Sequence, residues 1–400
     1  MEQNKIRPAF RTFQVEYAIR DIVEASQEAK KRGKDLIYLN IGDPVKYGFK
    51  TPESIIEAVC QALRENYNSY SDSSGIPEAI EAIKSYALKK GIKPVDIYIT
   101  QGATEAIEFA ISALVNSEEN ILLPCPCYPL YQAIISKFRI EPRYYLLDEN
   151  KNWEPDIDSI EALINKKTRA IVIINPNNPT GTVYFKEALE KIVDIAKKYN
   201  LVIFSDEIYD QYILEDNLEH ISIASLSEEV PVITFNGLSK NYFAPGFRIG
   251  WGIISGPKEV LKDYIEAIHK LARTRLCASH PLQFAIPVAL NNENYYIKDV
   301  IAKLKRRRDI LVEGLNQVPF ITCVKPLGAF YAFPSINIPD IDDLEFTKKL
   351  ILEEGVVVVH GSGFGQKPGT KHFRIIFLPE EEILEKALER IDRFIRRITS

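Results

Sequence analysis

The sequence predicts an α/β fold: a large domain with a mainly parallel sheet flanked by helices, plus a smaller α+β domain. Three observations lead to this prediction. The chain has 400 residues, more than one compact core of typical size holds, so two domains are expected. Short apolar runs alternate with helical stretches in the middle of the chain, which favours a parallel sheet. These runs are continuous, as expected where helices cover both faces of a sheet.

The composition excludes several classes of function. Hydrophobic residues make up 46% of the chain and charged residues 26%, the balance of an ordinary globular protein. With a net charge of −5 and its basic residues spread along the chain, the sequence predicts no nucleic-acid surface. The first ten residues lack an apolar signal core, and no apolar run reaches membrane-spanning length. We therefore expect a cytoplasmic protein that binds neither nucleic acid nor membrane.

The cysteines and histidines predict no metal or redox centre. The five cysteines are odd in number and form no C-x-x-C pair, and the five histidines are scattered. Reduced thiols in a cytosolic protein explain this pattern best. The cysteines are Cys60, Cys125, Cys127, Cys277 and Cys323.

Two helices are predicted before the first strand. Thr51 and Pro52 suit a helix start, with Thr51 as the N-cap and Pro52 at the first helical position. Pro77 starts the second helix in the same way. Apolar residues then recur on one face of each helix, at Ile55, Val59 and Leu63 and at Ile80, Ile83 and Ala87.

The strands of the large domain are predicted from the continuous apolar runs, and a helix follows the first of them, with Ile107, Ala110, Ile111 and Leu114 on one face. The runs are Ile97–Thr100, Ile121–Leu123, Tyr144–Leu147, Ala170–Ile174, Leu201–Phe204, Val232–Phe235 and Trp251–Ile254.

The pattern changes from about Tyr295, where a long charged helix is expected. Its run Arg306–Arg308 is most simply a solvated face. Three further strands and a closing helix follow, which predicts the smaller domain at this end of the chain, joined in space by the N-terminal segment. The strands are Leu327–Phe333, Val356–Val359 and Phe373–Phe377, and the helix is Glu380–Ile398. We place the large domain at 50–290 and the small domain at 1–49 with 291–400.

Ligands of open α/β sheets bind beyond the carboxyl ends of the strands, so the residues that follow each strand are the first candidates for a binding site. Gln101–Glu105 leads directly into a helix whose free N–H groups can bind a phosphate. The loop Asn175–Gly181 contains two prolines and can hold Asn178 rigidly. Each feature alone has a plainer explanation as a tight turn.

Charged residues follow other strands of the sequence. Asp206 ends an apolar strand, where a buried carboxylate needs a cationic partner or serves as a helix cap. Lys240 and Arg248 follow the run that ends at Phe235, and by default each is a surface charge or a salt-bridge residue. Arg374 lies within a predicted strand, and arginine is the side chain best suited to a two-point contact with a carboxylate.

Taken together and in order, these segments resemble the class I/II aminotransferases of pyridoxal-5′-phosphate (PLP) fold type I, over nearly the whole chain. The two most specific pieces are N-P-N-N-P-T-G at Asn175–Gly181 and S-K-x₇-R-x-G from Ser239 to Gly250. The other matching segments are Gly42–Pro44, Tyr70, Gly102–Thr104, Tyr128–Pro129, Ser205–Tyr209 and Phe373–Arg374.

Within the family, the chain looks most like the bacterial alanine transaminases of the glutamate–pyruvate type. The segments that carry this closer resemblance are Asn40–Pro44, Phe235–Lys240, Arg275–Ala278 and Val324–Ala329. The resemblance implies a transaminase that moves an amino group between an L-amino acid, with alanine favoured, and a 2-oxo acid, with 2-oxoglutarate favoured.

The resemblance also implies roles for individual residues. Lys240 holds the cofactor as an aldimine (Schiff base) and moves the substrate Cα proton, because a desolvated lysine beside cationic groups has a lowered pKa. Asp206 pairs with the pyridine nitrogen and keeps the ring protonated. Asn178 and Tyr209 bond to the phenolic oxygen, and Tyr128 stacks on the ring.

The phosphate of the cofactor is expected at the backbone N–H groups of Ala103 and Thr104 and at Arg248, with Tyr70 reaching it from the second subunit. This implies a homodimer with shared active sites. One position departs from the family, since many relatives have a serine where this chain has Gly237. Ser239 is the residue that could compensate.

The resemblance implies that the substrate carboxylate binds to Arg374, assisted by the Gly42 N–H and by Asn178. Tyr17 lies where the N-terminal segment of the family closes over the substrate. Gly361–Gly365 lacks the G-x-G-x-x-G spacing of a nucleotide loop and is expected to be a flexible loop near the site.

Three alternatives stay open. The amino donor could be aspartate or an aromatic amino acid, and the same residues could serve a PLP-dependent C–S lyase. A transaminase-like regulator is a third possibility, but family-like sequence begins too close to the start of the chain for a DNA-binding module. Retention of Lys240, Asp206 and Arg374 favours catalysis over regulation.

Overall fold

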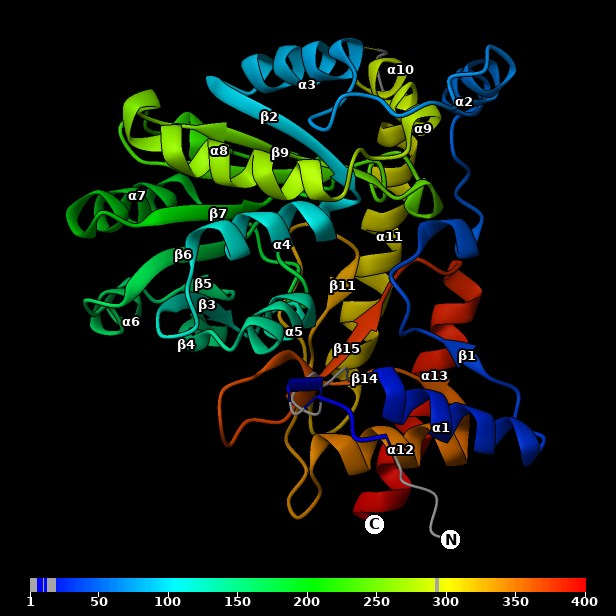
Figure 1. Cartoon of the computed structure of the whole chain (residues 1–400). Coiled ribbons are helices and arrows are strands. Elements are labelled where there is room, and N and C mark those ends of the chain that lie inside the picture. Colours follow the sequence, from blue (N-terminus) through cyan, green and yellow to red (C-terminus); the bar gives the residue numbers. More distant parts are fainter. Residues whose placement is uncertain (1–5, 10, 13–18, 292–294) are drawn as a thin grey trace, which may run out of the picture.

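A central sheet of eight strands organises the large part of the protein (Figure 1). The computed structural model describes residues 6–9, 11–12, 19–291 and 295–400. The strand order is β2-β9-β8-β7-β6-β3-β4-β5. Strands β8, β7, β6, β3 and β4 run parallel, whereas β9 is antiparallel to both of its neighbours and β5 is antiparallel to β4. The strands are β2 (Pro94–Gln101), β3 (Asn120–Cys125), β4 (Glu141–Asp148), β5 (Glu154–Pro155), β6 (Thr168–Ile174), β7 (Val202–Asp206), β8 (Val232–Gly237) and β9 (Ile249–Ser255).

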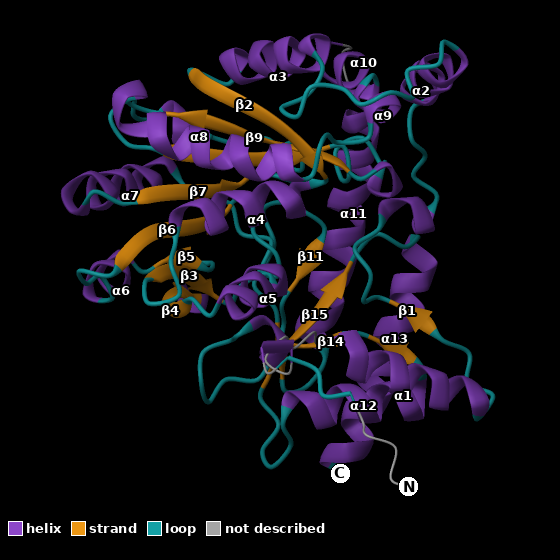
Figure 2. Cartoon of the chain, viewed as in Figure 1, coloured by secondary structure: helices purple, strands orange, loops and turns teal. Residues whose placement is uncertain are grey.

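Helices cover both faces of this sheet, and a separate apolar core lies on each face (Figure 2). Residues of one strand alternate between the two cores: Ile171 and Ile173 of β6 lie in one, and Val172 and Ile174 in the other. Side chains of α4, α5 and α8 complete one core, and side chains of α2, α3, α7 and α10 complete the other. This arrangement explains why the strands read as continuous apolar runs. The helices are α2 (Glu53–Arg64), α3 (Pro77–Lys89), α4 (Ala103–Leu114), α5 (Pro129–Phe138), α6 (Ile157–Ala162), α7 (Lys186–Tyr199), α8 (Lys258–Thr274), α9 (His280–Gln283) and α10 (Ala285–Asn291).

The remaining elements pack around a third core, formed mainly by residues after 295. The N-terminal segment joins them, because β1 (Ile37–Tyr38) pairs in parallel with β13 (Val356–Val357). A three-stranded sheet in the order β11-β15-β14 lies at the centre of this part. The other elements are α1 (Ile19–Lys31), α11 (Tyr295–Gln317), α12 (Asp343–Glu354), α13 (Glu381–Thr399), β10 (Ile321–Thr322), β11 (Tyr331–Ala332), β12 (Ser335–Ile336), β14 (Val359–His360) and β15 (Phe373–Ile376).

Three sequence predictions were wrong in detail. The run Arg306–Arg308 is not a solvated face, because Arg308 is fully buried, where it pairs with Glu215 (2.7 Å) and donates to the Pro326 carbonyl oxygen (3.0 Å). Thr51 is not the N-cap of α2, because its hydroxyl donates to the Phe243 carbonyl oxygen instead (2.6 Å) and Pro52 takes the cap position. The strand predicted at 327–333 shrinks to β11. The reason is that the N–H groups of Leu327 and Gly328 donate to the Gly181 carbonyl oxygen (2.9 and 2.8 Å), so this segment lies on the loop after β6.

No helix in the described part of the chain has both the length and the apolar character needed to cross a membrane.

Candidate active site

The carboxyl ends of β6, β7 and β8 bring the predicted site residues to one pocket of about 170 Å³. Their strands are in register here, since Ile174 is paired with Asp206 and Asp206 with Phe235. The start of α4 and the turn before β9 close the pocket. Of the predicted site residues, those that line the pocket are Ala103, Thr104, Tyr128, Asn178, Asp206, Tyr209, Lys240 and Arg248.

Lys240 follows β8, and its amine lies within the pocket. Its Nζ donates to the Gly42 carbonyl oxygen at 2.6 Å and stands 5.9 Å from the centre of the Phe330 ring. Burial lowers the pKa of Lys240 to about 8, although the Asp43 carboxylate acts in the opposite direction. Since the neutral amine is the nucleophilic form, this environment makes Lys240 reactive near neutral pH.

Asp206 is the last residue of β7 and is only 4% exposed. Its carboxylate accepts hydrogen bonds from the Ile208 N–H (3.3 Å) and the Tyr131 hydroxyl (3.2 Å). Burial nevertheless raises the pKa of Asp206 to about 6. A buried carboxylate with a raised pKa is stabilised by a cationic partner, so this end of the pocket suits a protonated ligand.

A candidate anion site lies where α4 begins. Gly102 has φ 75° and caps the helix without a side-chain hydrogen bond, so the first N–H groups face the pocket. A Cβ at Gly102 would lie 2.5 Å from Nη2 of Arg248, and a Cβ at Gly250 would lie 2.2 Å from the backbone nitrogen of Ala103. Two glycines therefore let an arginine and a strand approach the helix start closely.

The departure from the family at Gly237 has a steric reason. A Cβ at this position would lie 2.7 Å from the Ile249 carbonyl oxygen, so a serine does not fit between β8 and β9 without a backbone shift. Ser239 lines the pocket beside Lys240 instead.

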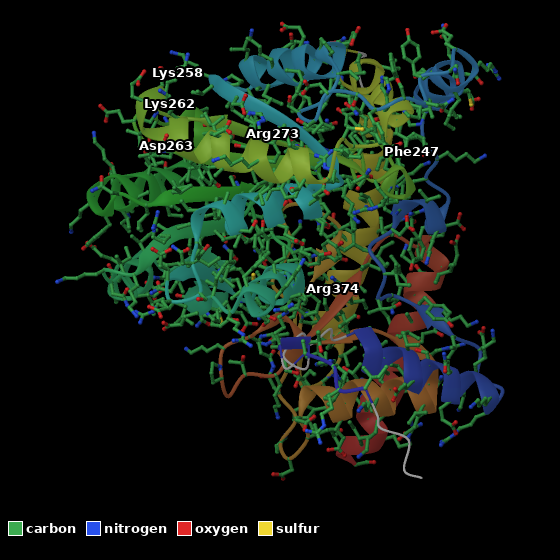
Figure 3. The ribbon with its side chains drawn as sticks, in the orientation of Figure 1. Phe247, Lys258, Lys262, Asp263, Arg273 and Arg374 are labelled. Carbon is green, nitrogen blue, oxygen red and sulfur yellow. The ribbon has the colours of Figure 1, made fainter. Side chains whose placement is uncertain are left out.

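Arg374 lies on β15, between the large sheet and the C-terminal helices (Figure 3). Its Nη1 donates to Oδ1 of Asn178 (3.1 Å) and its Nη2 to the Asn40 carbonyl oxygen (2.6 Å). The guanidinium is stacked between the rings of Tyr331 and Phe364, each at 4.8 Å. Arg374 is 5% exposed and its Nε has no hydrogen-bond partner, which leaves a buried donor suited to a carboxylate.

Sequence reasoning missed Tyr331. Its hydroxyl lies 2.8 Å from the hydroxyl of Tyr209, and a Cβ at Gly42 would lie 2.1 Å from it. Together with its ring contact to Arg374, Tyr331 touches three of the predicted site residues. The only signal was its place in a predicted strand, because the pairing of β11 with β15 cannot be read from the sequence.

Among the described residues, not all those predicted for the site line this pocket. Tyr70 is 78% exposed and is not part of this pocket. Tyr17 lies outside the described residues. The segment Gly361–Phe364, expected as a flexible loop, forms a short 3₁₀ helix, and its Phe364 contacts Arg374.

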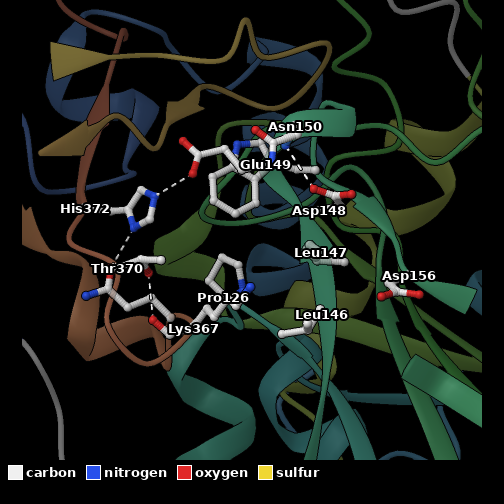
Figure 4. Close-up of a pocket in the computed structure, with 12 residues that line it drawn as sticks. Pro126, Leu146, Leu147, Asp148, Glu149, Asn150, Asp156, Lys367, Thr370 and His372 are labelled. Atoms are coloured by element: carbon white, nitrogen blue, oxygen red, sulfur yellow. Dashed lines mark hydrogen bonds and ion pairs between the residues drawn. The ribbon is translucent and has the colours of Figure 1, made fainter. Parts of the chain in front are cut away.

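A second pocket, of about 380 Å³, lies beside the β4–β5 hairpin (Figure 4). Its His372 bonds to Gln366 through Nδ1 (2.9 Å) and to Glu149 through Nε2 (3.2 Å). None of the predicted site residues lines it. The chemistry that the sequence predicts therefore belongs to the smaller pocket at the strand ends.

Comparisons with known proteins identify close relatives of this chain. The chain is 42% identical to the glutamate-pyruvate aminotransferase AlaA of Escherichia coli over 382 residues, 94% of each chain. It is 41% identical to the alanine aminotransferase of Mycobacterium tuberculosis over 390 residues, 95% of this chain and 90% of the relative. Its structure matches an alanine aminotransferase from Pyrococcus furiosus with a TM-score of 0.95 and 44% identity, over 98% of this chain and 100% of the other. The family model "Aminotransferase class I and II" matches residues 34–391, and the chain thus belongs to the class I and II aminotransferases.

Proposed function

We propose that this aminotransferase transfers the amino group between L-alanine and 2-oxoglutarate. The observation that carries the proposal is the similarity, at 41–44% identity over nearly the full length, to proteins named alanine or glutamate-pyruvate aminotransferases. Solved aminotransferases named for aspartate or tyrosine are similar at 26–29% identity. The alanine–glutamate assignment therefore has the stronger support.

Class I and II aminotransferases use PLP, and the residues of the pocket fit this cofactor. The anion site at α4 and Arg248 suits its phosphate, and the buried Asp206, with its raised pKa, suits its protonated ring nitrogen. When bound, PLP supplies an electron sink for negative charge at the substrate Cα. We infer that Ala103, Thr104 and Arg248 hold the phosphate.

Lys240 is the residue we assign to the covalent attachment of the cofactor and to proton transfer at the substrate Cα. Because its pKa is lowered, a substantial fraction of the Lys240 amine is neutral at the pH of the cell. Tyr128 covers one face of the ring in this proposal. Asn178 and Tyr209 donate to its phenolic oxygen, and Tyr331 orients the Tyr209 hydroxyl.

The substrate carboxylate is assigned to Arg374. The free Nε and the two hydrogen bonds that fix the guanidinium support this role, because a rigid arginine orients a carboxylate by two contacts. Gly42 lies against Tyr331, whose ring contacts Arg374, and in this proposal it assists through its N–H. Tyr17 stays a prediction for closure over the substrate.

We further propose a homodimer in which Tyr70 of each subunit completes the phosphate site of its partner. The exposure of Tyr70 supports this, since a large aromatic side chain that is 78% exposed in the single chain is available to a second one. The division into a large domain at 50–290 and a small domain at 1–49 with 291–400 is part of the same proposal.

A donor and acceptor screen tests the assignment. The purified protein is expected to show a cofactor absorbance band that L-alanine shifts and that 2-oxoglutarate restores. Aspartate and aromatic amino acids are run as competing donors, and release of pyruvate and ammonia from cystathionine tests for a lyase. A band that alanine leaves unchanged while another donor shifts it would overturn the alanine assignment.

A further inference from the structure

Three consecutive residues after β7 bond to the segment that carries Lys240. They belong to the turn that also follows Asp206, so one piece of chain joins Asp206 to the segment that carries Lys240. Asn241 Nδ2 donates to Asp210 Oδ1 (2.6 Å), and Gln211 Nε2 donates to the Tyr242 hydroxyl (3.2 Å). The Tyr212 hydroxyl donates to the Lys240 carbonyl oxygen (2.8 Å).

Asp210 is itself held by helix α3. Its Oδ2 accepts hydrogen bonds from the Tyr86 hydroxyl (2.5 Å) and from Lys90, with which it forms a salt bridge. The Asp210 side chain is fully buried, and burial, the largest single influence, acts to raise its pKa. The charges of Lys90 and His220 and the hydrogen bonds from Lys90 and Tyr86 together outweigh burial and lower the pKa. Asp210 therefore stays ionised and presents a fixed acceptor to Asn241.

We propose that Asp210 and Tyr212 are positioning residues for Lys240: Asp210 acts through Asn241, and Tyr212 acts through the Lys240 carbonyl oxygen. The proposal rests on the role assigned to Lys240 above. The lysine side chain is flexible and does not hold its amine in place by itself. The region that the amine can reach therefore depends on where the Lys240 backbone lies. Bonds to the Lys240 carbonyl and to the next residue fix that backbone.

The same turn fixes the distance between Lys240 and Asp206. The Glu207 N–H donates to the Phe235 carbonyl oxygen (3.0 Å), and Asn236 Nδ2 donates to the Glu207 carbonyl oxygen (3.0 Å). Both the N–H and the carbonyl of Glu207, the residue directly after Asp206, are thus bonded to the last residues of β8. A shift of about 1 Å in such a site lowers a rate by as much as about 100-fold.

The decisive variant is Asn241→Ala, which removes the hydrogen bond to Asp210 and leaves the Asp210–Lys90 pair in place. Its matched control is Asn120→Ala. Asn120 is also a buried amide; it lies at the start of β3, far from the pocket, and is bonded to Asn165 and Thr168. Both variants lose a buried amide, so both lose stability.

The two variants differ in what they do to the cofactor-loaded enzyme. Asn241→Ala is expected to lower kcat at least about tenfold with KM for the amino donor within about threefold. It is also expected to move the midpoint of the pH titration of the cofactor absorbance by at least about half a pH unit. Asn120→Ala is expected to change neither.

If Asn241→Ala does not fold, Tyr212→Phe decides, because it removes only the hydroxyl that bonds to the Lys240 carbonyl oxygen. A shift of the absorbance midpoint and a lower kcat support the proposal. An unchanged midpoint and an unchanged kcat overturn it.

The result is separable from the function proposed for Lys240. Lys240→Ala is expected to abolish both the pH-dependent band and turnover. If that variant keeps them, the role of Lys240 fails. If it loses them while Asn241→Ala behaves like Asn120→Ala, Lys240 keeps its role and only the positioning proposal is overturned.

Discussion

Burial changes the acid–base behaviour of the Lys240 amine more than any single neighbouring charge does. Its pKa falls to about 8, because the charged form loses solvation within the pocket. Lysine in water has a pKa of about 10.4, so only a very small fraction of such side chains is neutral at pH 7. In this pocket the neutral fraction at pH 7 is about a tenth.

The first prediction concerns pH. The neutral amine captures the cofactor, so in the cofactor-free protein the rate of capture should rise about tenfold per pH unit up to about pH 8 and then level off. Stopped-flow absorbance between pH 6 and 10 measures this rate. A rate that keeps rising to pH 10 would mean that Lys240 titrates like an exposed lysine.

The second prediction concerns Arg374. Arg374→Lys keeps the charge but cannot bond to Asn178, Asn40 and a carboxylate together, so KM for L-alanine should rise at least about tenfold. Steady-state kinetics at saturating 2-oxoglutarate measure it. Arg393→Lys is the control. Arg393 is an exposed residue of α13 that pairs with Glu354, so its replacement should leave KM for L-alanine unchanged. Equal KM values for both variants would contradict the assignment.

At the residue scale, the sequence identifies side chains whose order along the chain is characteristic of the family. Lys240, Asp206 and Asn178 were found in this way, and the structure places all three in one pocket. Tyr331 and Asp210 were not found. Their contacts depend on strand register and on which helix packs behind the site, and neither is encoded by local spacing.

At the scale of elements, the turn from β2 into α4 depends on close packing against β9. Gly102 and Gly250 both lie where a Cβ would collide, the first with Arg248 and the second with Ala103. The positive φ of Gly102 adds a conformational requirement to the steric one.

The third prediction tests this turn with two glycines of nearly equal φ. Gly102→Ala should displace Arg248 and raise the dissociation constant of the cofactor at least about tenfold. Gly33 has φ 76° and open space around the position of a Cβ. Gly33→Ala should therefore cost about 1 kcal/mol of stability and leave cofactor binding unchanged. Titration of the cofactor-free variants by absorbance checks both. Equal affinities would show that the contact between Gly102 and Arg248 has no role.

Most elements could be predicted because their apolar runs are long and buried on both faces. The run at Ala170–Ile174 became β6 with only small changes at its ends. The direction of each strand was harder to predict, since nothing in the run at Trp251–Ile254 indicates that β9 is antiparallel to its neighbours. The segment 327–333 was misassigned because its N–H groups bond to a distant loop.

At the scale of the whole molecule, the fourth prediction tests the shared site. Tyr70→Ala and Lys240→Ala should each be impaired alone. A refolded equal mixture should regain up to about a quarter of the wild-type sites, because half of the dimers then have one intact site. Activity and sedimentation of the mixture check this. A mixture no more active than the sum of its parts would argue against exchange of Tyr70 between subunits.

The family and its fold could be predicted from the sequence because the matching motifs extend over almost the whole chain, and the comparisons confirm both. The domain boundaries and the dimer stay predictions. They depend on contacts between surfaces, and surface residues such as Tyr70 are not distinguished by any periodic pattern in the sequence.

The sheet order has a consequence for the synthesis of this chain. Strand β2 leaves the ribosome early, yet its partner in the sheet is β9, and Gly250 of β9 packs on the start of α4. Chains are made and fold from the N-terminus onward, at about 5–20 residues per second. The end of the pocket at α4 is therefore completed late, after the parallel strands have emerged and once β9 is made.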